Sequence, residues 1–331
     1  MNNIEEIQQN YFEPFDSFCF QNSIKNILES YGVEDALDYL SMGISIKCMN
    51  SKDIKLFHET WEESLLYNYR NYMKINFSNP SLINEVMDEN RKLINIGYPL
   101  IIVCDTYYLP YTSYYNKTHG NHTVIMYGMD KIQKTVKISD CFHNWYYKGE
   151  IGEEVIRKAR KSRNPFDGGL FSGEPINLAW AMIEKSVWDG AKGELIRENL
   201  MGVVQNYYMN KDKDYLYGKE AYEFIGFKLA KTQEQEFYYK LYFEFYYYVK
   251  KRGLFAYYLS TLLDSILFSI KYFIERYNGN LAKWKMWLNI VLKEGLTEKG
   301  RMKKNIYDNY KWLIEEEAII INELDKIISV L

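Results

Sequence analysis

A cysteine close to the start of the chain occupies a position where a thiol can be reactive. Cys19 lies in the stretch FDSFCFQNSIKNIL, residues 15–28, just ahead of apolar residues at helical spacing. The N-terminus of a helix presents unpaired N–H groups and the positive end of the helix dipole, and both stabilise a thiolate. The alternative is a structural cysteine, because free cysteine is among the most buried residue types.

A histidine and an aspartate stand at the ends of two strands that are expected to be neighbours. His122 opens the run HTVIMYGMDK, and Asp140 closes the run VKISD. Neighbouring strands lie about 5 Å apart, so residues at paired strand ends can form hydrogen bonds. Cys19, His122 and Asp140 are therefore predicted to form a thiol triad, in which His122 takes the proton and Asp140 orients the imidazole. The structural alternatives are a surface histidine and an aspartate that begins a turn.

The elements that must position these residues are of mixed α and β type in the N-terminal half. Helical spacing predicts helices over residues 20–30 and 81–97, each stopped by a glycine. Apolar runs rich in β-branched residues predict four strands, at residues 98–108, 122–131, 135–141 and 144–151. Helices followed by an antiparallel sheet are typical of an α+β domain.

From about residue 175 the pattern becomes helical and predicts a small helical bundle. The expected helices are residues 174–187, 218–249, 253–278, 280–295 and 303–329. Residues 156–175 are basic and then rich in Gly and Pro, which predicts a linker or loop. The expected organisation is a catalytic domain over residues 1–155, the linker 156–175, and a helical domain over residues 176–331.

Composition excludes several classes of function. The net charge of −3 and the 26% of charged residues do not indicate a nucleic-acid or anionic-membrane partner. The four cysteines and four histidines form no cluster at zinc spacing, so no metal is expected. The first residues carry no signal-peptide pattern, which predicts a cytoplasmic protein with free thiols. Residues 253–273 are apolar, but Asp264 interrupts them, so a buried helix is expected and not a membrane span.

Three stretches together resemble the N-terminal domain of the butirosin-biosynthesis protein H family, over roughly residues 11–150. They are SFCFQNSIKNILESYG, PLIIVCDTYYLPYTSYYNKTHGNHTVIMYGMD and VKISD, and the most distinctive part is the run from Asp105 to Tyr111. The chain also looks similar to papain-like cysteine peptidases, in which a histidine opens one strand and a carboxylate or amide follows on the next. The resemblance implies an α+β papain-like fold in the N-terminal half, followed by a helical C-terminal half.

What the resemblance implies about function is acyl transfer. A cysteine-dependent acyltransferase would move an acyl chain from the thioester of an acyl or peptidyl carrier protein to a small amine, through an acyl-Cys19 intermediate. His122 would be the base and Asp140 its orienter, with no cofactor beyond the phosphopantetheinyl arm of the carrier. Similar papain-like proteins in thiotemplated polythioamide assembly, of the closthioamide type, join acyl chains to a diamine.

The family signature implies further residues around the site. Asp105, Tyr107, Tyr108 and Tyr111 are expected to line the site or to brace the loop that carries His122, with Asp105 in a supporting role. His119 is a spare candidate base.

The oxyanion site and the carrier-docking site are less well defined by the sequence. Papain-like proteases place a glutamine six residues before the cysteine, and Glu13 stands there in this chain. The backbone N–H of Cys19 is the expected first donor, and Gln21 is a candidate for the second donor, which the sequence leaves open. The basic run RKARKSR, residues 157–163, is expected either to dock an acidic carrier protein or to be a solvated helix end.

Two functions of other classes remain open. A cysteine protease or amidase would use the same three residues to hydrolyse a peptide or amide. A non-catalytic binding protein could keep the fold without using Cys19 as a nucleophile.

Overall fold

The structure is a computed structural model of the chain. It describes residues 6–10, 12, 18–44, 46–49, 54–56, 60–142, 145–167, 171–185, 188–210, 212–232, 234–262, 269–297 and 302–331. The chain divides into two compact units, each built from two segments. The first unit comprises residues 1–40 and 61–190, and the second comprises residues 41–60 and 191–331. The expected domains were continuous segments, and the observed units are not. The reason is that residues 47–49 pair with residues 215–217, and residues 73–76 pair with residues 180–183.

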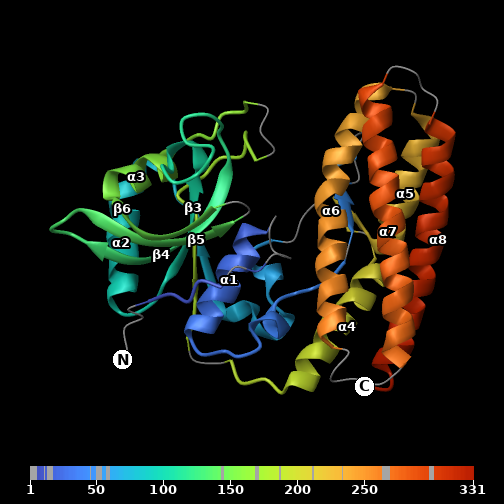
Figure 1. The fold of residues 1–331 in the computed structure, drawn as a ribbon, viewed down its shortest axis with the longest axis horizontal. Helices are drawn as coiled ribbons and strands as arrows, with labels where there is room; N and C mark the ends of the chain where they lie inside the picture. Colours follow the sequence, from blue (N-terminus) through green and yellow to red (C-terminus); the bar gives the residue numbers. More distant parts are fainter. Residues whose placement is uncertain are drawn as a thin grey trace. The chain divides into compact units, whose positions relative to one another are not determined.

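The first unit is built on a six-stranded sheet in which all neighbouring strands are antiparallel. In spatial order the strands are β2 (Met73–Asn76), β7 (Trp180–Ile183), β3 (Leu100–Asp105), β4 (Asn121–Asp130), β5 (Thr135–Phe142) and β6 (Trp145–Gly152). The strands β3 to β6 are the four that the sequence predicts. Figure 1 shows β4 and β5 as long green arrows within this unit.

Three helices pack on the sheet. The helices α2 (Ile83–Asn95) and α3 (Glu153–Lys161) form a common core with alternate residues of β3, β4 and β5. The helix α1 (Cys19–Ser30) packs against the same three strands. Gly32 and Gly97, with φ of 89° and 95°, follow the ends of α1 and α2 as expected, because glycine adopts this left-handed conformation without steric cost.

Short 3-10 helices connect these elements. They are η2 (Ala36–Tyr39), η3 (Glu62–Ser64), η4 (Tyr67–Tyr72), η5 (Pro80–Leu82) and η6 (Thr106–Tyr108).

Two sequence predictions in this unit are wrong. Residues 174–187 were expected to be helical, but residues 180–183 form β7, which pairs with β2 on one side and β3 on the other. All four residues of β7 are buried, so the strand lacks the alternation that would separate it from a buried helix. The expected linker 156–175 is wrong for residues 156–161, which belong to α3 and place Ile156 and Ala159 in the core.

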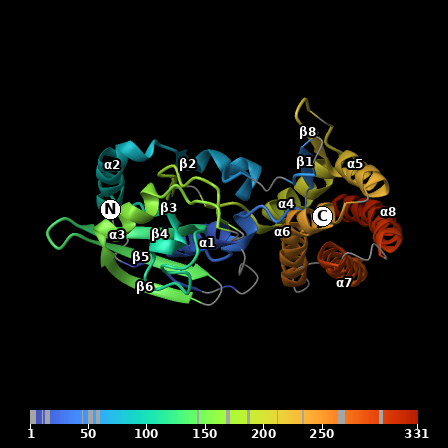
Figure 2. The ribbon, with the colours of Figure 1, turned by 90° about the horizontal axis from the view of Figure 1, so that it is seen from above.

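The second unit is mainly helical, which confirms the helical C-terminal half. Its elements are β1 (Lys47–Met49), α4 (Lys192–Tyr208), β8 (Tyr215–Tyr217), α5 (Gly218–Lys231), α6 (Gln235–Thr261), α7 (Ser269–Leu296) and α8 (Lys303–Ile328). The strands β1 and β8 form a two-stranded antiparallel sheet, which ties the early segment to the later helices. Figures 1 and 2 show α7 running between α6 and α8, and α7 contacts both helices.

A buried ion pair lies in the core of the helical unit. The guanidinium of Arg252 donates to Glu317 Oε1 at 2.8 Å, to Tyr248 OH at 2.8 Å and to Asn280 Oδ1 at 2.7 Å. The rings of Tyr248, Tyr277 and Trp284 surround the same guanidinium, with its central carbon 5.0 to 5.6 Å from the ring centroids. These tyrosines therefore serve core packing.

Among the helices of the described residues, none combines the length and the apolar character that crossing a bilayer requires. In the apolar stretch 253–273, residues 253–261 belong to α6 and residues 269–273 to α7. Asp264, which the sequence argument used, lies outside the described residues.

Candidate active site

The thiol of Cys19 lies at the first residue of α1. The carbonyl of Phe18 accepts the N–H of Asn22 at 3.0 Å, which closes the first turn and leaves the N–H groups before it outside the helical ladder. Burial raises the pKa of the Cys19 thiol. The hydrogen bond and positive charge of His122, together with the hydrogen bonds of Thr123, lower this pKa by more than burial raises it. The net result is a pKa below the ordinary thiol value.

The other three cysteines provide a contrast within the same chain. Cys48, Cys104 and Cys141 are free and buried, and burial raises the pKa of each thiol to about 12. All four cysteines lie within the described residues, and of these four only Cys19 is both partly exposed and lowered in pKa. Of the four thiols, that of Cys19 is therefore the one that ionises most readily.

His122 and Asp140 meet across the neighbouring strands β4 and β5. The Nε2 atom of His122 lies 2.9 Å from both carboxylate oxygens of Asp140. Because Nε2 faces the carboxylate, Nδ1 is the ring nitrogen left for the thiol of Cys19. Burial lowers the pKa of His122, but the charge and hydrogen bond of Asp140, together with Cys19, raise it to about 10. The three groups therefore favour a thiolate and imidazolium pair.

The carboxylate of Asp140 is held from two further sides. Its Oδ2 atom accepts the hydroxyl of Tyr111 at 2.8 Å and the indole N–H of Trp145 at 3.1 Å. Its backbone carbonyl accepts the side-chain amide of Gln9 at 2.8 Å. The indole of Trp145 also packs edge-on against the His122 ring, with centroids 5.6 Å apart. These contacts fix the carboxylate relative to the imidazole.

A second buried carboxylate braces the residues just before β4. Asp105 is fully buried, and its Oδ1 accepts the N–H groups of Tyr107 at 3.0 Å and Gly120 at 3.1 Å. Its Oδ2 lies 2.7 Å from His119 Nδ1 and also accepts the hydroxyl of Ser162. The ring of Tyr107 stacks on His119, with centroids 4.4 Å apart. Asp105 thus holds the turn that leads into His122.

A cavity of about 290 Å³ opens beside the thiol, which we call the thiol pocket. Its lining residues are Cys19, Thr106, Tyr114, Thr118, His119, Gly120, Asn121, His122, Phe142, Trp145 and Phe171. This described lining holds four aromatic side chains besides the two histidines, and it holds no carboxylate. The pocket therefore suits an apolar group next to a nucleophile.

Of the other sequence-predicted residues, His119 belongs to this lining and the rest of those described do not. Tyr111 contacts Asp140, Tyr107 contacts His119, and Tyr108 lines a different pocket. The side-chain amide of Gln21 donates to Ser64 Oγ at 3.3 Å and is not part of the described lining. Glu13, and the two histidines at positions 58 and 143, lie outside the described residues.

Several pocket residues were missed by the sequence analysis. Phe142 is the last residue of β5, Trp145 is the first residue of β6, and Phe171 belongs to the segment expected to be a linker. The carbonyl of Phe171 accepts the N–H of Asn121 and the side-chain amide of Asn164, which ties this segment to the start of β4. For Trp145, the available signal in the sequence was its position five residues after Asp140.

In the described part of the chain, no group of three or more His, Cys, Asp or Glu side chains has the arrangement of a metal site.

The comparison with known families agrees with the resemblance. Residues 19–141 match the family model described as Butirosin biosynthesis protein H, N-terminal. The segment runs from Cys19 past Asp140 and so contains all three residues of the site. The match names no polythioamide-forming enzyme, and no curated protein matches the chain significantly.

Proposed function

We propose that the chain is a cysteine-dependent acyltransferase that forms an amide from a carrier-bound thioester and an amine. The observation that carries the proposal is the geometry of the site: Cys19 and His122 line one pocket, and the Nε2 atom of His122 lies 2.9 Å from the Asp140 carboxylate. The lowered pKa of Cys19 is consistent with this arrangement. The match to a biosynthetic family over residues 19–141 supports a role in natural-product biosynthesis. The net charge of the chain, −3, does not indicate a substrate class.

In the first step, the Cys19 thiolate attacks the carbonyl carbon of the thioester. A new C–S bond forms to Cys19, and the C–S bond to the pantetheine thiol breaks. The His122 imidazolium gives its proton to the leaving thiolate, which departs as a neutral thiol. The backbone N–H of Cys19, at the start of α1, is the proposed donor to the oxyanion.

In the second step, a neutral amine attacks the acyl-Cys19 thioester. The nitrogen loses a proton to His122, and Cys19 leaves as a thiolate, so the thiolate and imidazolium pair is restored. The overall exchange of a thioester for an amide is downhill and requires no cofactor other than the pantetheinyl arm of the donor. Water is the competing nucleophile, and the aromatic lining of the thiol pocket favours its exclusion.

The amine partner is a small amine, and a diamine is the specific candidate. A diamine carries a second ammonium group that has to be accommodated. Because the described lining of the thiol pocket holds no carboxylate, the rings of Tyr114, Phe142 and Trp145 are the groups offered to that cation.

The test is the intact mass of the protein after incubation with an acyl-pantetheine or acyl-carrier thioester, with and without a diamine. We expect the wild type to gain one acyl mass and to lose it as an amide when the diamine is added. Cys19→Ala should gain nothing, whereas Cys141→Ala, which removes a thiol of raised pKa, should behave as the wild type.

Three outcomes would overturn the proposal in different ways. Discharge by water at the same rate without amine would make the protein a hydrolase. Acylation of Cys141→Ala and Cys19→Ala alike would place the reactive thiol elsewhere. Absence of any adduct would favour a binding protein of the same fold.

A further inference from the structure

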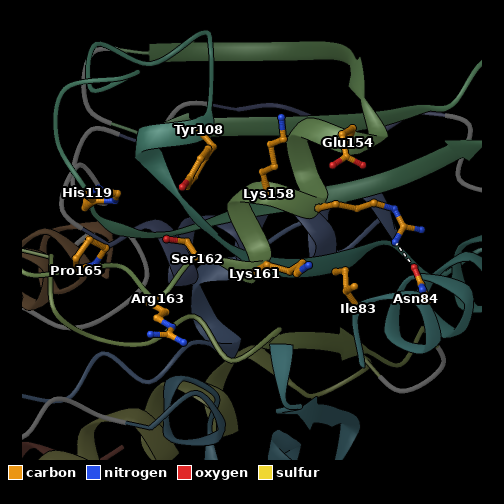
Figure 3. A pocket seen from close by; sticks show the side chains of 11 residues that line it. Ile83, Asn84, Tyr108, His119, Glu154, Lys158, Lys161, Ser162, Arg163 and Pro165 are labelled. Carbon is orange, nitrogen blue, oxygen red and sulfur yellow. Dashed lines mark hydrogen bonds between the residues drawn. The ribbon is translucent and has the colours of Figure 1, made fainter. Parts of the chain in front are cut away.

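A second cavity in the first unit, of about 670 Å³, lies along α3 and is distinct in its chemistry from the thiol pocket. Its lining residues are Ile83, Asn84, Tyr108, His119, Glu154, Arg157, Lys158, Lys161, Ser162, Arg163 and Pro165. We call it the basic pocket, because four cations face one carboxylate in this lining. Figure 3 shows Lys158, Lys161 and Arg163 around it, with His119 at one end and Asn84 at the other.

The helical period of α3 sorts the basic run 157–163 into two groups. Arg160 points into the core, where it donates to Asn90 Oδ1 at 2.6 Å and to the carbonyl of Leu178 at 2.8 Å. Arg157, Lys158 and Lys161 lie on the pocket side, since residues three and four apart share a helix face. The basic run is therefore divided: Arg160 is buried in the core, and the side chains on the pocket side are available to a ligand.

The charges of the basic pocket are mostly uncompensated. Arg157 is paired with Glu153 at 2.7 Å and donates to Asn84 Oδ1 at 2.8 Å. Lys158, Lys161 and Arg163 are exposed, and within the described residues they have no ion-pair partner. The three free cations exceed the single negative charge of Glu154, and Tyr108 adds a hydroxyl to the lining. Such a site favours a compact anion with several acceptor oxygens, which describes a phosphate group.

The two pockets share one lining residue. His119 lines both the basic pocket and the thiol pocket, and its Nδ1 atom is fixed by Asp105. A ligand that holds an anion at α3 can therefore extend past His119 toward Cys19. A phosphopantetheinyl thioester has this form, because a phosphate stands at one end of the arm and the thioester at the other.

We propose that the basic pocket binds the phosphate of a phosphopantetheinyl donor and so positions its thioester at Cys19. The inference rests on the proposed acyl transfer and adds the subsite that recognises the donor. The phosphate can belong to a carrier protein or to coenzyme A, because the same phosphate chemistry occurs in both.

The test compares acylation of Cys19 by butyryl-pantetheine, which lacks the phosphate, with acylation by butyryl-phosphopantetheine. We expect kcat/KM to be about 10-fold to 100-fold higher for the phosphorylated donor, the effect of one or two charge-assisted contacts. In Lys158→Ala/Lys161→Ala the ratio of the two donors should fall toward one. The matched control is Lys92→Ala/Lys131→Ala, which removes two exposed lysines of the same unit that lie outside the pocket lining and should preserve the ratio.

Two further arms identify the source of the phosphate. Faster acylation by the butyryl-carrier protein than by butyryl-coenzyme A would assign the pocket to the carrier arm, and the reverse order would assign it to coenzyme A. A ratio near one in the wild type would overturn the proposal. It would also be overturned if Lys158→Ala/Lys161→Ala slowed only the carrier-bound donor, because the pocket would then contact the carrier surface.

A binding measurement separates this inference from the proposed function. Calorimetry with Cys19→Ala should detect phosphopantetheine binding that is at least tenfold tighter than pantetheine binding, and Lys158→Ala/Lys161→Ala should remove the difference. This result would support the phosphate subsite even if no acyl transfer were found. Equal affinities for the two compounds would refute the subsite even if acyl transfer were established.

Discussion

The Nε2 atom of His122 lies 2.9 Å from each carboxylate oxygen of Asp140, so one ring nitrogen is fully committed to the carboxylate. The opposite nitrogen, Nδ1, is consequently the one presented to Cys19. This relationship sets both the orientation of the imidazole and its charge.

Alkylation of Cys19 should show a low thiol pKa. Because the pKa is lowered, the thiolate persists to a lower pH, and the iodoacetamide rate should reach half its maximum below the ordinary thiol value of about 8.5. His122→Ala removes the charge and hydrogen bond that lower the pKa while burial remains. The inflection should then move above about 8.5. Mass spectrometry locates the label, and a wild-type inflection at the ordinary value would contradict the assignment.

Asp140→Asn should slow acylation by about 10³-fold, within the usual range for a positioned acid or base. The substitution keeps the shape of the side chain but removes the negative charge that raises the pKa of His122. In the wild type the imidazolium persists up to about pH 10, and acylation should decline as the pH rises through that value. In the variant this decline should begin at a lower pH. Asp130→Asn, at the last residue of β4, is the control, and an unshifted decline in Asp140→Asn would argue against the pairing.

Asp105→Asn should destabilise the first unit by about 2 kcal/mol, because an amide cannot accept all the hydrogen bonds that this carboxylate accepts. The loss should appear as a lower denaturant midpoint in unfolding followed by tryptophan fluorescence. Asp88→Asn, on the surface of α2, serves as the comparison and should leave the midpoint unchanged. A midpoint for Asp105→Asn equal to that of the wild type would show that Asp105 does not brace the turn before His122.

Glu317→Leu should destabilise the helical unit by about 3 to 5 kcal/mol, since it leaves the buried guanidinium of Arg252 without its carboxylate. The double variant Glu317→Leu/Arg252→Met should lose much less, because both charges are then gone. Urea unfolding followed by far-ultraviolet circular dichroism measures both effects. Additive losses in the double variant would mean that the two side chains do not act as a pair.

The site residues differ in how much local sequence could reveal about them. The glycine stop after α1 and the apolar runs of β3, β4 and β5 are local patterns, and the structure contains each element. Cys19, His122 and Asp140 were predicted as a triad because the sequence places them at or near the ends of expected elements, where side chains of neighbouring elements can meet. Asp105 was predicted only as part of the family signature. Its hydrogen-bond partners could be found only from the folded structure.

The sequence by itself determined the helical and strand periods, the four free cysteines and the candidate triad, because each depends on residue type and short-range spacing. Only the tertiary structure decided that residues 180–183 pair between β2 and β3, that Phe171 returns to the thiol pocket, and that Arg160 faces inward. These features depend on contacts between distant segments. A strand that is buried on both faces and a buried helix both appear in the sequence as a continuous apolar run, so local pattern does not separate them. The pKa of Cys19 belongs to the same class, since it arises from a histidine more than one hundred residues away.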